Sequence, residues 1–318
     1  MSAEFNLIQK YFTRPTSSAD LGIGDDAALI QVSAGHQLAI STDMSAVGTH
    51  FSQEAAPYDI GWKSLAVNIS DMAAMGTEPK WATLSIALPE INEAWLKAFS
   101  EGFFACADAF KVDLIGGDTT RGALNIAVQI MGEVPIGKAL TRSGAQIGDD
   151  VWVSGFLGNA ALGLAHMQHK QTLNDETLTT CLQALHRPQP RSGLGLALRE
   201  IAHSCIDVSD GLLADLEHIL KASNQGATLQ LENIPCLPAI KQRLQEPDIQ
   251  QAVLAGGDDY ELCFTAASNQ REVILTLAKQ LDVTLTHIGE INSTGKLIVL
   301  SGDNRLNMTK LGYDHFTI

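Results

Sequence analysis

The sequence predicts a mixed α/β protein made of two domains. Stretches of alternating apolar and polar residues, typical of strands, are interleaved with stretches whose apolar residues recur at helical spacing. The length of 318 residues fits two domains better than one. Residues 135–150, with several glycines, a proline and little periodicity, separate the two sets of elements. We therefore expect a β-rich N-terminal domain over residues 1–137 and a C-terminal α/β domain over residues 138–318.

The elements of the N-terminal domain are predicted from apolar spacing and capping residues. Helices are expected over residues 5–12, 57–76 and 92–110. Strands are expected over residues 27–32, 37–42, 81–88, 112–115 and 124–134. A turn at residues 33–36 joins the first two strands, and this hairpin is expected to bring Asp26 and Asp43 close together.

The C-terminal domain repeats the alternation of short strands and amphipathic helices. Strands are expected over residues 151–154, 205–208, 260–265, 285–288 and 297–300. Helices are expected over residues 158–167, 177–186, 194–202, 212–222 and 271–281. The helix that begins at Leu212 should present Ser209, Asp210 and Gly211 at its N-terminus.

Composition and charge argue against polyanionic binding partners and indicate the cellular compartment in which the protein works. A net charge of -15 argues against nucleic acid or an anionic membrane surface, because both are polyanions. The five cysteines form no CxxC pair, so neither a zinc clamp nor a disulfide framework is indicated. The N-terminus lacks the apolar core of a secretory signal, and no run approaches the roughly 20 apolar residues of a membrane span. We expect a cytoplasmic protein.

Aspartates recur beside glycine or hydroxyl residues at the edges of apolar runs. The segments that carry them are GIGDDAA from Gly22, STDM from Ser41, NISDMAAMG from Asn68, GGDTTRG from Gly116, DVSDGL from Asp207 and GGDDYEL from Gly256. Adjacent buried carboxylates need a compensating charge, and hard cations such as Mg²⁺ prefer carboxylate and hydroxyl oxygens. Taken singly, each aspartate is better explained by an Asx-turn or a helix cap. Their number favours one shared metal and phosphate site.

Asp71, within one of these segments, and His50 and Arg142, outside them, also bear on this site. Asp71 lies in the last turns of the helix 57–76, where a carboxylate opposes the helix dipole unless a cation is near. His50 is either a surface histidine or part of the site of Asp43. Arg142 is either a solvated arginine or a clamp for a phosphate group.

The ordered set of motifs resembles that of the thiamine-monophosphate kinases, a family of the aminoimidazole ribonucleotide synthetase-like superfamily. Besides the aspartate segments, the resemblance includes GTHF from Gly48, LTRSGA from Leu140 and GYDHF from Gly312. It extends from the first helix to the last residues. One departure is Asp258, where the family often has glutamate, so the arm of that carboxylate is shorter here.

The resemblance implies a fold of two α/β domains, a homodimer formed through the N-terminal domain, and ATP-dependent phosphorylation of thiamine monophosphate, the final step of thiamine diphosphate synthesis. It implies Mg²⁺ ligands at Asp26, Ser41, Thr42, Asp43, Asp71, Asp118, Asp207 and Asp210. It implies ATP contacts from Gly117, Asp118, Arg142 and Ser209, and contacts to the acceptor from His50, Asp258 and Tyr313. The residues expected to act on the transferring group are Asp43, Asp71, Asp210 and Arg142.

The chemistry of this reaction agrees with the residues present. A phosphate monoester has its second pKa near 6, so at neutral pH its oxygen is already a nucleophile and no general base is needed. Direct in-line transfer then requires positioning and neutralisation of charge, which metal ions and an arginine supply. The same aspartates would also suit a metal-dependent phosphohydrolase, another ATP-using member of the superfamily, or a non-catalytic sensor of Mg-nucleotide.

Overall fold

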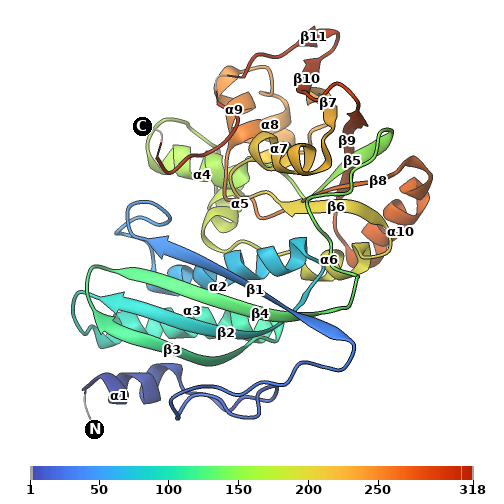
Figure 1. Ribbon diagram of the computed structural model, residues 1–318. Coiled ribbons are helices and arrows are strands. Elements are labelled where there is room, and N and C mark those ends of the chain that lie inside the picture. Colours follow the sequence, from blue (N-terminus) through green and yellow to red (C-terminus); the bar gives the residue numbers. More distant parts are fainter. Residues whose placement is uncertain (1–2, 309, 317–318) are drawn as a thin grey trace. The chain divides into compact units, whose positions relative to one another are not determined.

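The computed structural model describes residues 3–308 and 310–316, as shown in Figure 1. Strands and helices are mixed throughout, which confirms the predicted α/β class. The chain divides into two compact units. The first comprises Met1–Met72 and Thr77–Gly137, and the second comprises Ala73–Gly76 and Lys138–Ile318.

The first unit contains a four-stranded sheet. Its strands, in spatial order, are β1 (His36–Ala46), β4 (Asn125–Pro135), β2 (Glu78–Leu88) and β3 (Asp113–Arg121). β4 is antiparallel to both β1 and β2, whereas β3 runs parallel to β2. β1 pairs with β4 over eleven residues, and this long pairing fixes the register of β1, the strand that carries the STDM motif.

Two long helices, α2 (Pro57–Ala74) and α3 (Glu93–Phe110), lie behind this sheet in Figure 1. The Asn92 side chain caps α3 by accepting a hydrogen bond from the backbone N–H of Trp95, as its place before the apolar pattern predicted. The helices cross closely at two glycines. A Cβ on Gly102 would lie 1.9 Å from the carbonyl oxygen of Tyr58, and one on Gly61 would lie 2.1 Å from that of Phe99. This close crossing fixes α2, and therefore Asp71 near its end.

The predicted strand 27–32 is wrong. This stretch is irregular, and its only strand-like pairing is the isolated bridge of Leu29 with Leu21. Its apolar residues Ala28 and Ile30 instead pack on a small cluster of Trp81, Ile115 and Met131. The chain before it contains α1 (Ala3–Leu7) and a π-helical turn at Ile8–Phe12. The expected hairpin between residues 27–32 and 37–42 is therefore absent, because β1 pairs with β4 instead.

The second unit is built on a seven-stranded mixed sheet. In spatial order its strands are β11 (Asn304–Arg305), β10 (Leu297–Ser301), β7 (Gly226–Gln230), β9 (Leu285–Asn292), β5 (Asp149–Ser154), β8 (Leu262–Ala267) and β6 (Ala202–Asp207). Its helices are α4 (Asn159–Met167), α5 (Asp175–His186), α6 (Ser192–Leu198), α7 (Leu212–Ser223), α8 (Pro238–Lys241), α9 (Pro247–Ala255) and α10 (Arg271–Leu281). Two apolar clusters form its core, one containing residues of α4, α7 and α9 and the other residues of α6 and α10. The sequence patterns missed β7, β11, α8 and α9.

Within the described residues, no helix is both long enough and apolar enough to cross a membrane.

Candidate active site

The first unit brings together a serine and two aspartates from β1 and α2. The Ser41 hydroxyl donates a hydrogen bond to an Asp71 carboxylate oxygen (2.5 Å). The backbone N–H of Asp43 donates to the side-chain oxygen of Asn68, also on α2 (3.1 Å). Because side chains alternate along a strand, Ser41 and Asp43 share the face of the sheet that α2 covers. Asn68 is a residue that the sequence analysis did not assign to the site, although it lies in the NISD motif.

The Asp43 carboxyl group lies in an unfavourable environment for a negative charge. Burial, and then the like charge of Asp71, raise the pKa of Asp43 to about 7. A divalent cation coordinated by these oxygens would offset both effects. The three side chains Ser41, Asp43 and Asp71 offer only oxygen donors, which is the ligand type that Mg²⁺ prefers. The residues present therefore fit a magnesium site.

Thr42 and Asp118 lie on the opposite face of the sheet from this cluster. Asp43 is aligned across the sheet with Val128, Leu84 and Gly117, and residues aligned in this way point to one face. The neighbouring positions Thr42 and Asp118 are exposed and point the other way. The structure thus does not bring the Thr42 and Asp118 side chains into the group formed by Asp43 and Asp71.

The predicted strand 112–115 is too short, since β3 continues through most of the GGDTTRG segment to Arg121. Gly117 has a φ of +150°, and a Cβ there would lie 1.9 Å from the carbonyl oxygen of Leu84. Only glycine fits this close approach of β3 to β2. The motif glycine thereby fixes the position of Asp118 on the exposed face.

The two remaining predicted residues of the first unit lie in loops. Asp26 is exposed, and its backbone N–H donates to the side chain of Asp25. No described contact joins it to Asp43, so the structure does not show the expected proximity of these residues. His50 lies in the turn after β1, where its Nδ1 accepts a hydrogen bond from the backbone N–H of Ala46 (3.1 Å). The neutral ring therefore carries its proton on Nε2.

The second unit brings its predicted residues together through backbone hydrogen bonds between three segments. β6 and β8 are antiparallel with Asp207 opposite Leu262, so DVSDGL and GGDDYEL meet at one end of the sheet. The N–H of Asp258 donates to the carbonyl of Ser209 (2.8 Å), and the N–H of Tyr313 donates to the carbonyl of Asp210 (2.9 Å). The structure thus gathers the predicted residues Asp207, Ser209, Asp210, Asp258 and Tyr313.

The GGDDYEL segment is held in a strained conformation. Asp258 and Tyr260 both have positive φ values, 70° and 50°, which are uncommon outside glycine. The Tyr260 hydroxyl donates to the Asp258 carboxylate (3.0 Å). Next to them, the buried Glu261 carboxylate accepts hydrogen bonds from Arg191 and from the Ser154 hydroxyl. These contacts hold Asp258 in a defined orientation.

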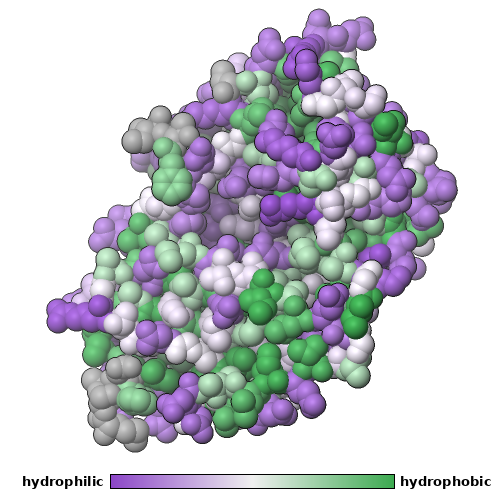
Figure 2. All heavy atoms as spheres, in the orientation of Figure 1, coloured by the Kyte–Doolittle hydropathy of each residue, from purple (hydrophilic) through white to green (hydrophobic). Residues whose placement is uncertain are grey.

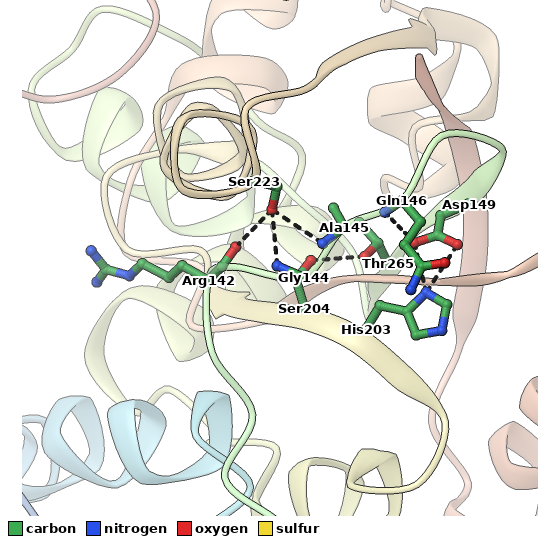
Figure 3. Close-up of polar contacts among 9 residues, drawn as sticks. All are labelled: Arg142, Gly144, Ala145, Gln146, Asp149, His203, Ser204, Ser223 and Thr265. Carbon is green, nitrogen blue, oxygen red and sulfur yellow. Dashed lines mark hydrogen bonds and ion pairs between the residues drawn. The ribbon is translucent and has the colours of Figure 1, made fainter. Parts of the chain in front are cut away.

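Arg142 lies in a loop that is held by the last residue of α7, drawn above the loop in Figure 3. The Ser223 hydroxyl oxygen accepts hydrogen bonds from the N–H groups of Gly144 (3.2 Å) and Ala145 (3.1 Å) and donates to the carbonyl of Arg142 (3.4 Å). The Arg142 side chain projects away from these contacts. Its guanidinium group is exposed and well placed to meet an anionic ligand.

One further cluster of possible ligands, Asp150, His287 and Glu290, is better explained as an ion pair. Arg271 donates to both carboxylate oxygens of Asp150, at 2.5 and 2.6 Å. His287 Nε2 lies 2.9 Å from the carbonyl oxygen of Gly289, so this nitrogen acts as a hydrogen-bond donor and not as a metal ligand. The oxygen donors of the first unit therefore remain the candidate metal centre.

Comparisons with known proteins place this site in a known class. The family model for the N-terminal domain of AIR synthase related proteins matches residues 24–134, and the model for the C-terminal domain matches residues 146–301. The fold and the aspartate-lined motifs are thus those of a two-domain AIR synthase related protein.

Full-length relatives identify the family within this class. The thiamine-monophosphate kinase of Escherichia coli (strain K12) is 43% identical over 98% of both chains. The crystal structure of thiamine-monophosphate kinase from Stenotrophomonas maltophilia K279a is 47% identical over 93% of both chains, with a TM-score of 0.83. The complex of AaThiL with AMPPCP and TMP is 26% identical over 98% of this chain and 96% of that one, with a TM-score of 0.77. The chain belongs to the thiamine-monophosphate kinase family.

The environment of Asp43 predicts that its removal stabilises the metal-free protein. A pKa raised from 3.8 to about 7 means that the folded state binds this proton more tightly than the unfolded state does. The resulting stability is fully present below pH 3.8 and is lost as the pH rises through about 7. Asparagine does not titrate. In EDTA at alkaline pH, Asp43→Asn should therefore raise the free energy of unfolding by about 1 to 2 kcal/mol, and the gain should shrink in acid.

Denaturant unfolding in EDTA across this pH range measures the effect. Asp303→Asn, in the exposed turn before β11, is the control and should not change the pH dependence. Adding Mg²⁺ should stabilise the wild-type protein more than Asp43→Asn. An Asp43→Asn variant that is less stable than wild type at every pH would show that Asp43 does not bear an unfavourable charge.

Proposed function

We propose that this protein transfers the γ-phosphoryl group of ATP to thiamine monophosphate, giving thiamine diphosphate and ADP. The observation that carries the proposal is the half-buried oxygen cluster of Ser41, Asp43 and Asp71, which suits a cation and lies in a chain of the thiamine-monophosphate kinase family. The acceptor phosphate is nucleophilic at neutral pH, so the site has to position two anions and reduce their repulsion. It does not have to remove a proton.

We assign metal-binding roles to oxygen ligands within each unit. In the first unit these are Ser41, Asp43 and Asp71, with Asp26 as a further ligand, and in the second unit they are Asp207 and Asp210. Thr42 and Asp118 are left out because they lie on the opposite face of the first sheet. Bound Mg²⁺ would neutralise charge on the phosphate oxygens during transfer. Asn68 holds the backbone of Asp43, and the Ser41 hydroxyl orients the Asp71 carboxylate. Both contacts prepare the oxygens before a ligand arrives.

The substrate contacts follow from exposure and charge. Arg142, exposed on its fixed loop, binds a phosphate of ATP, and Ser209, at the other end of α7, makes a separate contact to the nucleotide. Asp258 and the half-exposed ring of Tyr313 favour the cationic thiazolium of the acceptor, the first by charge and the second by its aromatic face. His50 offers the N–H of Nε2 to the acceptor. We assign direct action on the transferring group to the carboxylates Asp43, Asp71 and Asp210; Arg142, whose loop is held at the opposite end of α7 from Asp210, contacts the nucleotide elsewhere.

We further propose that the protein is a homodimer formed through the exposed face of the first sheet. Along β1, Leu38, Ile40 and Met44 are 37%, 55% and 58% exposed and point to this face. Figure 2, which views it, shows apolar side chains gathered over the strands of the first unit. A row of this kind is typical of a protein interface. A second copy would cover it and would also meet Thr42 and Asp118.

A cytoplasmic location is consistent with the cysteines. All five are buried free thiols, as expected in a reducing compartment.

The proposed reaction predicts a strict choice of acceptor. Thiamine monophosphate should support ADP formation with equal amounts of thiamine diphosphate, whereas free thiamine should not, because its hydroxyl needs a general base and lacks the phosphate that the metal ions position. Phosphorus NMR of both reactions measures this directly. ADP and inorganic phosphate released at the same rate without any acceptor would indicate a phosphohydrolase. Comparable turnover of free thiamine would also contradict the assignment.

The proposed dimer predicts different outcomes for two equally exposed isoleucines. Ile40→Lys should produce monomers, because it places a charge in the apolar row of β1. Ile91→Lys changes a residue that is 57% exposed, against 55% for Ile40, but lies in the loop before α3, so it should leave the dimer intact. Sedimentation velocity measures the assembly, and circular dichroism confirms folding. A wild-type monomer, or a folded Ile40→Lys dimer of unchanged affinity, would refute this interface.

A further inference from the structure

The beginning of α7 holds an acidic residue that none of the motifs includes. Asp215 lies in the first turn of the helix and is buried, with 3% exposure. One of its carboxylate oxygens accepts hydrogen bonds from the backbone N–H groups of Ser209, Asp210 and Gly211, each at 3.0 Å. These three residues are the SDG of the DVSDGL motif. Hydrogen bonds to a carboxylate are stronger than those between neutral groups, so Asp215 fixes the shape of this loop.

This contact changes what the loop can bind. A free helix N-terminus attracts phosphate because its backbone N–H groups are unpaired. Here those groups are already occupied by the carboxylate of Asp215, so the expected presentation of phosphate-binding N–H groups does not occur. The loop offers the Ser209 hydroxyl and the Asp210 carboxylate instead. With Asp207 and Asp215 close by in the chain, this end of α7 is suited to a cation rather than to a bare anion.

The other end of α7 fixes the loop of Arg142. Ser223 is the last residue of the helix. Its hydroxyl accepts hydrogen bonds from the N–H groups of Gly144 and Ala145 and donates one to the carbonyl oxygen of Arg142 (Figure 3). The N–H of Cys205 on β6 donates to the carbonyl of Thr141 (2.9 Å). The loop backbone is therefore fixed on both sides of Arg142, while its charged side chain projects outward.

The helix between these two contacts is rigidly packed. Leu212, Leu216 and Ile219 are fully buried in the core of the second unit. With 12 residues, α7 is about 18 Å long, so it sets the separation between its two ends. A shift of either loop would break hydrogen bonds to a helix that cannot follow.

We propose that α7 positions the two ligand-binding loops of the second unit, with Asp215 and Ser223 as its positioning residues. Asp215 holds Ser209 and Asp210 for a magnesium-bound phosphate, and Ser223 holds Arg142 for a phosphate of the nucleotide. The roles given to these loops rest on the proposed kinase function. Neither positioning residue touches a substrate, so each acts only through the loop that it holds.

Two substitutions test the two ends separately. Ser223→Ala should raise the KM for ATP by about tenfold and leave the KM for thiamine monophosphate unchanged, because it loosens Arg142. Ser223→Thr keeps the hydroxyl and should restore the wild-type value. Asp215→Asn keeps the shape and one oxygen acceptor but loses the charge, so it should lower kcat by about tenfold and raise the Mg²⁺ concentration needed for half-maximal activity. Glu217→Gln, which only removes a surface ion pair with Lys221, is the control and should behave as wild type.

Calorimetric binding of Mg-AMPPCP provides a second readout that does not require turnover. Ser223→Ala should weaken this binding about tenfold even if the acceptor has been assigned wrongly, so failure of the kinase assignment and failure of the positioning role are distinguishable. Circular dichroism and thermal unfolding establish that each variant folds. Folded variants with reduced thermal stability but unchanged KM values, Mg²⁺ dependence and nucleotide affinity would overturn the proposal, because the two residues would then have a structural role only.

Discussion

The proximity of two carboxylates on the covered face of the first sheet is the constraint on which the site depends. Asp43 and Asp71 repel each other, and burial deprives Asp43 of the water that would screen this repulsion. Such an arrangement persists only where the surrounding structure holds it. Here the support comes from the eleven-residue pairing of β1 with β4 and from the close glycine crossing of α2 and α3. A cation bound by these oxygens would restore the stability lost at the carboxylates.

In the second unit, the predicted ligand-binding side chains lie on irregular segments, which have to be held in place by other contacts. Its three motif segments are joined by backbone hydrogen bonds, which leave the side chains of Ser209, Asp210 and Tyr313 available for ligands. The positive φ of Asp258 is maintained by its N–H bond to Ser209 and by the network around Glu261. Loops fixed in this way need little rearrangement on binding, which reduces the entropic cost of ordering them around a substrate.

The sequence predicted the elements whose ends carry clear signals, such as α3 after its Asn92 cap and α10 over residues 271–281. It failed for residues 27–32, because alternating apolar residues suit a segment lying on a sheet as well as a strand within one. The motif residues of the second unit were predicted and are gathered by the fold. The opposite placement of Thr42 and Asp118 was not foreseen, because the strand was predicted to end at Ile115, before Asp118. The role of Asp215 was not predicted, because acidic residues are common in the first turn of any helix and therefore give no signal of a special function.

Calorimetric titration of a non-hydrolysable ATP analogue with and without Mg²⁺, at fixed ionic strength, tests most directly whether the aspartates form a cation site. If they do, Mg²⁺ removes the penalty for bringing a polyanion to a negative site, and analogue and metal bind with positive coupling, typically about 1 to 3 kcal/mol between linked sites. The coupling should be smaller in Asp43→Asn. Equal affinity for the analogue with and without Mg²⁺ in the wild-type protein would contradict a cation site at Asp43 and Asp71.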